Sequence, residues 1–158
     1  MKLSVIIPAY ITSGKGANDL VLLVRKVASQ INPNEHEVVV VDDTSPEIKA
    51  SDLEFPGVDY YRLSENSGVA VARNFGIANT GGDYVVFLDA DDDIPDDFIA
   101  ILDDRIAYEV QQDGRADIVQ FKAKHEDGNI AYPEPCAWGK LIKLEWIGDC
   151  QPLILLHK

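Results

Sequence analysis

The stretch Tyr84–Phe98, YVVFLDADDDIPDDF, joins a continuous apolar run to a dense group of aspartates. The run has the β-branched and aromatic character of a buried strand. Six carboxylates then follow within nine residues, namely Asp89, Asp91, Asp92, Asp93, Asp96 and Asp97. Because like charges repel, this arrangement predicts that a cation, a helix N-terminus or open water lies beside the aspartates.

Strand-like segments recur along the chain, and helical patterns lie between them. The predicted strands are residues 3–8, 37–43, 58–63, 83–89 and 116–123. The early strands are continuously apolar, which is typical of a sheet covered on both faces. The sequence therefore predicts an α/β fold with a mostly parallel, Rossmann-like sheet and helices on both of its faces.

The first two predicted helices have recognisable end signals. Residues 18–31 carry apolar side chains at helical spacing, and Asn18 is the expected N-cap. Residues 67–82 are rich in alanine, with Ser67 as the expected cap and Gly81–Gly82 as the stop.

A third helix is expected to start within residues 94–97, where proline and acidic residues suit a first helical turn. Its expected apolar stripe consists of Phe98, Ile101, Leu102, Ile106 and Val110. Further on, Asp127–Gly128 predicts a hairpin turn, and residues 136–146 are expected to form a short helix.

Polar residues cluster where the predicted strands end. The four clusters are AYITSGKG (9–16), DDTSP (42–46), SENSG (64–68) and DADDD (89–93). In open parallel sheets, ligands bind beyond the carboxyl ends of the strands. The placement predicts one ligand site.

Composition narrows the class of ligand. The chain has 158 residues, which suits one domain, and 14 basic against 27 acidic side chains give a net charge of −13. This charge argues against nucleic acid as a partner, whereas a small phosphorylated ligand is compatible if a metal ion supplies positive charge.

Two cysteines without metal spacing, Cys136 and Cys150, and a short apolar N-terminal run predict a cytoplasmic protein, with attachment to the inner face of the membrane as an alternative.

The acidic stretch has three readings. The later aspartates suit a solvated loop and a helix start. A calcium loop is excluded, because the sixth position is Ile94 rather than Gly and the twelfth is Ala100 rather than Glu. In the third reading, Asp89 and Asp91 form a D-x-D site for a divalent metal shared with substrate phosphates. Spacing alone leaves the first and third readings open.

Other polar residues are also ambiguous. The pair Asp42–Asp43 suits an Asx-type turn, or a carboxylate that accepts hydrogen bonds from a ribose or a base. Arg73 suits a surface ion pair or a donor fork for a nucleotide. Surface or loop positions are expected for the three histidines, His36, His125 and His157.

In combination, these motifs resemble a known family. The segments SVIIPAY (4–10), VVVVDDTSPE (38–47) and NSGVAVARNFGIANTGGDYVVFLDADD (66–92) resemble family 2 glycosyltransferases with the GT-A fold, and PCAWGKLI (135–142) is similar to their acceptor-side segment. The resemblance implies a nucleotide-diphosphate sugar donor, often UDP-linked, inversion at the anomeric carbon, and an unknown carbohydrate or lipid-linked acceptor. It also implies a single domain over residues 1–158, with a donor-binding half (1–115) and a partial acceptor half (116–158); a homodimer is a further expectation.

The resemblance assigns roles to residues of this chain. Pro8, Ala9 and Tyr10 would line the pocket for the base and the ribose. Asp43 would accept a hydrogen bond from the base, and Asp42 would support that turn.

Three further residues complete this set. Arg73 would contact the nucleotide, and Asp89 would lie near the ribose. Asp91, together with Asp89, would coordinate the Mn²⁺ or Mg²⁺ ion that bridges the diphosphate.

The chain also departs from the family pattern. Ile11 stands where the family usually has Asn, and DDTSPE replaces the commoner DDGS turn. The general base, usually acidic, is expected outside this chain, and Asp149 does not match its segment. The alternative function is therefore a nucleotide-sugar-binding module without transfer. A nucleotidyltransferase would need a basic Gly-rich loop after the first strand, and the segment there lacks the expected Arg. A receiver domain would need its acidic pair after the first strand, whereas the pair here follows the second.

Overall fold

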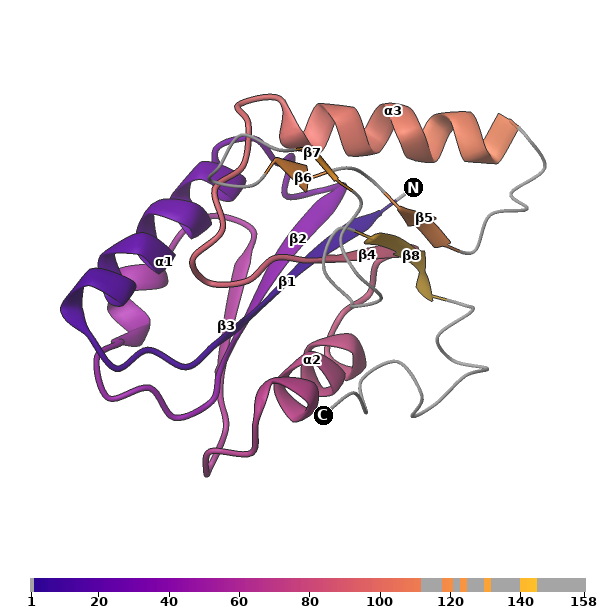
Figure 1. Cartoon of the computed structure of the whole chain (residues 1–158). Coiled ribbons are helices and arrows are strands. Elements are labelled where there is room, and N and C mark those ends of the chain that lie inside the picture. The colour runs from indigo at the N-terminus through magenta and orange to yellow at the C-terminus, as the bar shows by residue number, and fades with distance from the viewer. Residues whose placement is uncertain (1, 112–117, 121–122, 125–129, 132–139, 145–158) are drawn as a thin grey trace.

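A computed structural model gives the fold of residues 2–111, 118–120, 123–124, 130–131 and 140–144 (Figure 1). In chain order, the elements are β1 (Leu3–Ala9), α1 (Gly14–Ala28), β2 (His36–Asp42), the 3₁₀ helix η1 (Ala50–Leu53), β3 (Val58–Arg62), α2 (Val69–Ala78), β4 (Tyr84–Phe87), α3 (Phe98–Gln111), β5 (Ile118–Gln120), β6 (Ala123–Lys124), β7 (Ile130–Ala131) and β8 (Lys140–Lys143).

The main sheet has six strands in the order β3-β2-β1-β4-β8-β5, and its first four strands are parallel. All seven residues of β1 are buried, in keeping with a central strand that is covered on both faces. Strand β8 runs antiparallel to both β4 and β5. The mostly parallel α/β sheet is thus confirmed.

Strand β8 contradicts the expected helix over residues 136–146, as far as the structure describes that segment. Val85 pairs with Ile142 and Val86 with Leu141, and both β8 residues are buried. Pairing with the open edge of β4 satisfies the backbone of β8, and this long-range effect overrides the local helical pattern.

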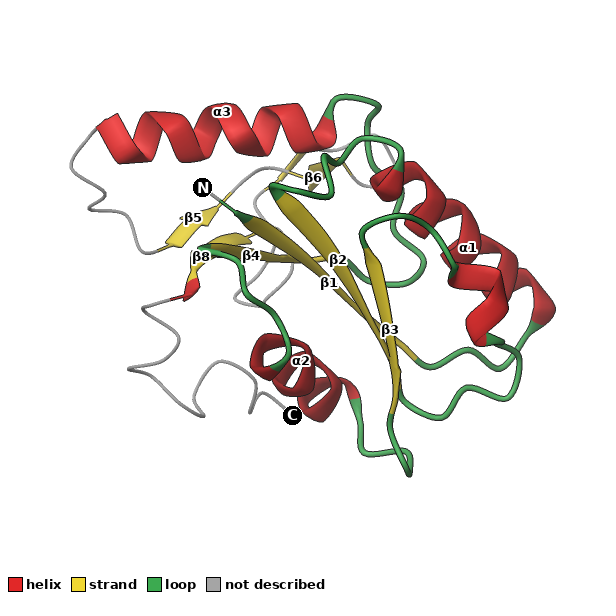
Figure 2. Ribbon diagram, turned by 180° about the vertical axis from the view of Figure 1, so that it is seen from behind, coloured by secondary structure: helices red, strands yellow, loops and turns green. Residues whose placement is uncertain are grey.

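Helices cover both faces of the sheet (Figure 2). One core cluster joins α1 and α3 to one face of the sheet, and it includes the predicted α1 stripe of Leu20, Leu23, Val24, Val27 and Ile31. The second cluster joins α2 to the opposite face through Ala72. Among the described helices, none has both the length and the apolar character needed to cross a bilayer.

The expected ends of the first two helices were wrong. Helix α1 begins four residues before Asn18, because the Ser13 side chain caps it by accepting a hydrogen bond from Gly16 N–H at 3.2 Å. Helix α2 makes no side-chain cap bond at its N-cap residue and ends at Ala78, before the glycine pair. Ser67 therefore does not cap α2.

Helix α3 begins at Phe98, after the proline that was expected in its first turn, and its buried side is rotated from the predicted stripe. Ile101 and Val110 are 51% and 46% exposed, whereas Ile99 is buried. Glu109 is buried as well, because Arg105 forms an ion pair with it one turn earlier in the helix.

His36 is also buried, contrary to the expected surface position. It is the first residue of β2, and its Nε2 atom lies 3.2 Å from Asp103 Oδ2 of α3. The expected turn at Asp127–Gly128, both cysteines, the other two histidines and Asp149 lie outside the described residues.

Candidate functional site

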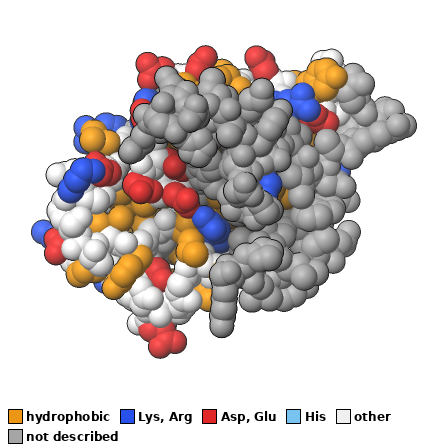
Figure 3. All heavy atoms as spheres, in the orientation of Figure 1, with side chains coloured by type: hydrophobic (Ala, Val, Ile, Leu, Met, Phe, Trp, Pro, Cys, Tyr) orange, Lys and Arg blue, Asp and Glu red, His pale blue; other side chains and the backbone are white. Residues whose placement is uncertain are grey.

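The predicted site residues meet at the edge of the sheet where the parallel strands end. Tyr10 follows β1, Asp43 follows β2, and Asp89 comes two residues after β4. Strands β2 and β4 lie on opposite sides of β1, so the strand order reverses here, and such switch points bind ligands in open α/β sheets. In the left part of the view in Figure 3, several acidic side chains lie close together, with hydrophobic and basic side chains around them.

The residues Pro8, Ala9 and Tyr10 differ in what they present to this edge. Pro8 and Ala9 are buried in β1, where they pair with Val41 and Asp42. The pairing of β1 with β4 ends at Ile6, so the missing N–H group of Pro8 removes no residue pair between these two strands. Tyr10 is 54% exposed and is therefore the side chain of the three that can contact a ligand in the crevice.

Asp42 is fully buried and holds three hydrogen-bond donors. Its carboxylate accepts from Ser45 N at 2.7 Å, from Tyr60 Oη at 2.5 Å and from Arg62 Nη1 at 2.5 Å. Burial raises the pKa of the Tyr60 hydroxyl, and the hydrogen bond to Asp42 raises it further. The hydroxyl therefore keeps its proton and acts as a hydrogen-bond donor. Asp42 thus holds the turn after β2 through Ser45 N, and its part in nucleotide binding stays a prediction.

Ser45 extends this network to the segment after β1. Its hydroxyl oxygen accepts a hydrogen bond from Ile11 N at 2.8 Å, and the residue is 1% exposed. The turn after β2 and the chain next to Tyr10 are therefore joined through a buried contact.

Asp43 caps helix α2 from another element. Its Oδ1 accepts from Ser67 N at 2.7 Å and its Oδ2 from Gly68 N at 2.8 Å, directly before the first residue of α2. This contact replaces the expected cap by the Ser67 side chain, and the helix dipole favours an anion at this end. An ionised carboxylate offers about four acceptor positions, so the two bonds leave acceptor positions unfilled on a residue that is 3% exposed.

Thr44 lies between these two networks in a left-handed conformation, with φ of 64°. Such a conformation is uncommon for a residue other than glycine. The departure from the DDGS pattern therefore falls on the residue whose backbone favours glycine. The Thr44 hydroxyl donates to the Asp43 carbonyl oxygen at 2.6 Å.

Arg73 and Asp89 form an ion pair across the switch point. Arg73 Nη2 donates to Asp89 Oδ1 at 2.7 Å, and the guanidinium carbon lies 5.7 Å from the centre of the Phe87 ring. The Arg73 side chain is 15% exposed, and its buried Nε atom has no hydrogen-bond partner in the described part of the chain. Helix α2 and the end of β4 thus bring together two of the predicted site residues.

The other aspartates after β4 differ in their partners. Asp92 Oδ2 accepts from Asp89 N at 2.7 Å and closes a tight turn. Lys26 Nζ lies 3.0 Å from Asp93 and 3.5 Å from Asp96, and its hydrogen bond with Asp93 raises the pKa of the lysine. Asp91 is exposed and has no polar partner among the residues that the structure describes.

These carboxylates provide a partial donor set for a metal. Within the described ranges, no group of three or more His, Cys, Asp or Glu side chains is arranged to hold an ion. Magnesium and manganese often use one or two carboxylates and take the remaining ligands from water or phosphate. The exposed carboxylate of Asp91 fits such a shared site, and Asp89 fits it if its pair with Arg73 rearranges.

Several structural partners were missed in the sequence. They are Ser45, Tyr60, Arg62, Lys26 and Gln30. Tyr60 and Arg62 are two residues apart in β3 and so point to the same side, which was an available signal. Lys26 and Gln30 are four residues apart, one helical turn, but their partners lie far along the chain.

Comparison with known proteins identifies the family. The sequence profile of glycosyl transferase family 2 matches residues 4–135. YfnE of Bacillus subtilis, an uncharacterized glycosyltransferase, is 38% identical over 96 residues, which cover 58% of this chain and 23% of that protein.

Solved structures show the same fold. TarS 1–349 of S. aureus in complex with UDP has a TM-score of 0.76 at 26% identity, covering 95% of this chain and 49% of that one. The mannosyltransferase PcManGT of Pyrobaculum calidifontis, in complex with GDP-Man and Mn²⁺, has a TM-score of 0.69 at 20% identity, covering 94% of this chain and 46% of that one. This chain thus spans about half of each solved structure. The predicted GT-A architecture is confirmed, and the chain belongs to glycosyl transferase family 2.

Proposed function

We propose that this chain binds a nucleotide-diphosphate sugar, UDP-linked, as the donor part of an inverting, metal-dependent glycosyltransferase. The observation that carries the proposal is the turn after β4. There Asp91 is exposed and unpartnered within the described residues, two residues from the Arg73–Asp89 ion pair. The TarS and PcManGT complexes with UDP and with GDP-Man and Mn²⁺ support this class of ligand.

The nucleotide would lie across the ends of β1 and β2. The exposed ring of Tyr10 and the backbone of Pro8 and Ala9 would line the base and ribose pocket. Asp43 would use its remaining acceptor capacity for a base N–H group. Asp42 would act indirectly, by fixing the turn that carries Asp43.

The diphosphate would lie near the turn after β4. Arg73 carries a planar, permanently charged donor group that suits phosphate oxygens, and Asp89 would turn towards the ribose once Arg73 contacts the nucleotide. Asp91, with Asp89, would hold Mn²⁺ or Mg²⁺, which when bound supplies Lewis-acid stabilisation of the negative charge on the leaving diphosphate. An acceptor hydroxyl, from a carbohydrate or a lipid-linked carbohydrate, also has to lose a proton to a general base. No base is assigned among the described residues.

Calorimetric titration with UDP, in the presence and absence of Mn²⁺, tests the donor part of the proposal. We expect Mn²⁺ to increase UDP affinity in the wild type and Asp91→Ala to lose this gain. The matched control is Asp97→Ala, because Asp97 is also an exposed aspartate without a side-chain partner in the described part of the chain. An Asp91→Ala protein that keeps the full Mn²⁺ effect would contradict the assignment.

Transfer is tested separately from binding. UDP release from UDP-sugars in the presence of Mn²⁺ and candidate acceptors would support an enzyme. Tight binding without turnover would favour the nucleotide-sugar-binding module. A cytoplasmic location and a homodimer stay predictions from the sequence, to be checked by cell fractionation and light scattering.

A further inference from the structure

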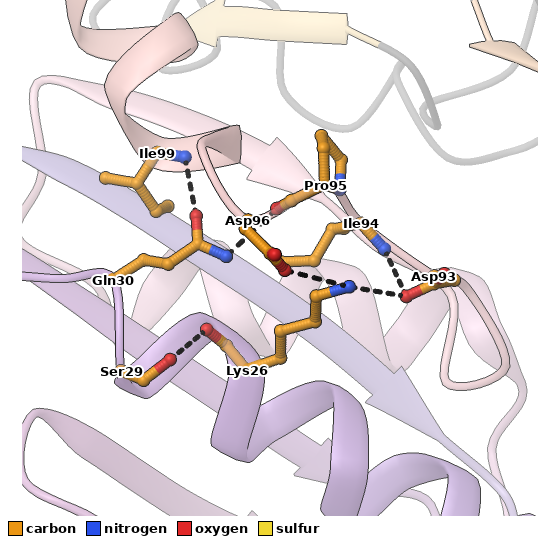
Figure 4. A network of polar contacts seen from close by, with 8 residues as sticks. All are labelled: Lys26, Ser29, Gln30, Asp93, Ile94, Pro95, Asp96 and Ile99. Carbon is orange, nitrogen blue, oxygen red and sulfur yellow. Dashed lines mark hydrogen bonds and ion pairs between the residues drawn. The ribbon is translucent and has the colours of Figure 1, made fainter.

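Helix α1 and the segment after it are bound to the acidic loop between β4 and α3 (Figure 4). Lys26 Nζ lies 3.0 Å from Asp93 Oδ1 and 3.5 Å from Asp96 Oδ1. Asp93 Oδ1 also accepts from Ile94 N at 2.9 Å, so one carboxylate connects the lysine to the backbone of the loop. One cation thereby reduces the repulsion between two of the six aspartates.

Gln30 makes a second, bidentate contact with the same loop. Its Nε2 donates to the Pro95 carbonyl at 3.0 Å, and its Oε1 accepts from Ile99 N at 3.2 Å. Ile99 is the second residue of α3, so Gln30 satisfies one of the N–H groups that a helix leaves free at its start. The glutamine thus caps α3 from another element, and Figure 4 shows both of its bonds.

Asp91 lies in the same loop, two residues before Asp93, the first residue that Lys26 contacts. On the β4 side, Asp89 and Asp92 close a turn through Asp89 N to Asp92 Oδ2 at 2.7 Å and Asp92 N to Asp89 O at 3.0 Å. On the α3 side, Ile94 is buried in the core at 4% exposure, next to the residues that Lys26 and Gln30 contact. Asp91 therefore lies in a short loop that is fixed at both ends.

We propose that Lys26 and Gln30 are positioning residues for Asp91. They hold the loop in its bound conformation, so that donor and cation binding does not have to order it. This inference rests on the proposed function, since it concerns the same metal site. If the loop adopts its binding-competent conformation only part of the time, the apparent affinity for the ligand is reduced in proportion to the fraction of molecules in that conformation.

The test uses Lys26→Met and Gln30→Met, which keep side-chain length but remove the charge or both hydrogen bonds. The controls are Lys49→Met, at an exposed position directly before η1, and Gln111→Met at the exposed end of α3. Two quantities are measured: amide hydrogen exchange of residues 89–99 without nucleotide, and UDP affinity with and without Mn²⁺.

In both test variants we expect faster exchange in residues 89–99. We expect the Mn²⁺-dependent gain in UDP affinity to fall about tenfold in Gln30→Met and about threefold in Lys26→Met, while affinity without Mn²⁺ changes less than about twofold. The controls should match the wild type in both measurements.

Three results would overturn the inference. If the wild type gains affinity with Mn²⁺ and the two variants gain equally, the positioning role is wrong and the proposed function stands. If affinity falls in parallel with and without Mn²⁺, the contacts serve general stability only. If the wild type shows no Mn²⁺ effect, the proposed function fails, and the positioning role fails with it whatever the exchange data show.

Discussion

The Ser45 hydroxyl oxygen accepts a hydrogen bond from the backbone N–H of Ile11 at 2.8 Å, and this buried contact joins the segments that follow β1 and β2. The backbone N–H of the same serine donates to Asp42 at 2.7 Å. Ser45 therefore connects the chain next to Tyr10 to the network that holds Asp42. The position of the exposed tyrosine depends on a residue that does not itself reach the crevice.

The first prediction concerns this contact. Ser45→Ala leaves the Ile11 N–H buried without an acceptor, which should lower the free energy of unfolding by about 1–3 kcal/mol. Urea denaturation measures the loss. Ser29→Ala is the control, because Ser29 is exposed and donates to the Lys26 carbonyl at 2.8 Å; its effect should stay within about 0.5 kcal/mol. Equal losses in the free energy of unfolding of the two variants would show that the hydrogen bond from Ile11 N contributes no more to stability than the exposed Ser29 contact does.

The second prediction concerns the packing of α2 on the sheet. A Cβ atom at Gly76 would lie 2.5 Å from Ile6 Cγ2 of β1, well inside van der Waals contact. Overpacking of this kind costs about 1–3 kcal/mol, against a gain of up to about 1 kcal/mol in helix propensity for alanine. Gly76→Ala should therefore be less stable than the wild type in thermal and urea denaturation.

Gly14→Ala provides the matched control for this packing argument. Gly14 is the first residue of α1, and an added Cβ would meet no atom within 4 Å. Its stability should be unchanged or slightly higher, because alanine favours the helix. A Gly76→Ala protein as stable as Gly14→Ala would mean that α2 moves away from the sheet without loss.

Much of the fold of residues 2–111 could be predicted from the sequence, because its strands are continuous apolar runs whose polar ends mark one edge of the sheet. The helix α1 start was missed, because Gly14 and Gly16 lower helix propensity and hide the Ser13 cap. The buried side of α3 differs from the predicted stripe, because Ile99 and Ile101 both fit helical spacing and the sequence does not choose between them. Only packing against the core selects Ile99.

The site contacts could not be predicted, because they join distant parts of the chain. The cap of α2 by Asp43 spans 24 to 25 residues, and the contact of Lys26 with Asp93 spans 67. The acidic group suggested that something offsets its repulsion, but residue spacing carries no information on which cation does so. The fold supplies Arg73 for Asp89 and Lys26 for Asp93 and Asp96.

A polar cluster at the other end of the sheet provides the third prediction. Glu37 accepts hydrogen bonds from Lys2 Nζ at 2.7 Å, Ser4 Oγ at 2.6 Å, Thr80 Oγ1 at 2.5 Å and Gly81 N at 2.8 Å. Burial alone would raise the pKa of this carboxyl, but the four donors outweigh burial and lower the pKa from 4.5 to about 2.

This pKa shift makes folding sensitive to acid. Because the folded protein binds the Glu37 proton more weakly than the unfolded chain does, the stabilisation is complete above the unfolded pKa of 4.5 and is lost as pH falls towards 2. Glu37→Gln cannot take up this proton, and its neutral amide does not attract the Lys2 ammonium group as the carboxylate does. At pH 6 the variant should therefore be less stable than the wild type. The difference in urea midpoint between the two proteins should then shrink between pH 5 and pH 2.5, since the wild type loses its advantage there. Glu35→Gln, at an exposed position two residues earlier, is the control for the loss of one carboxylate. A Glu37→Gln difference that is constant over this range would mean that the four donors stabilise the neutral carboxyl as well as the charged one.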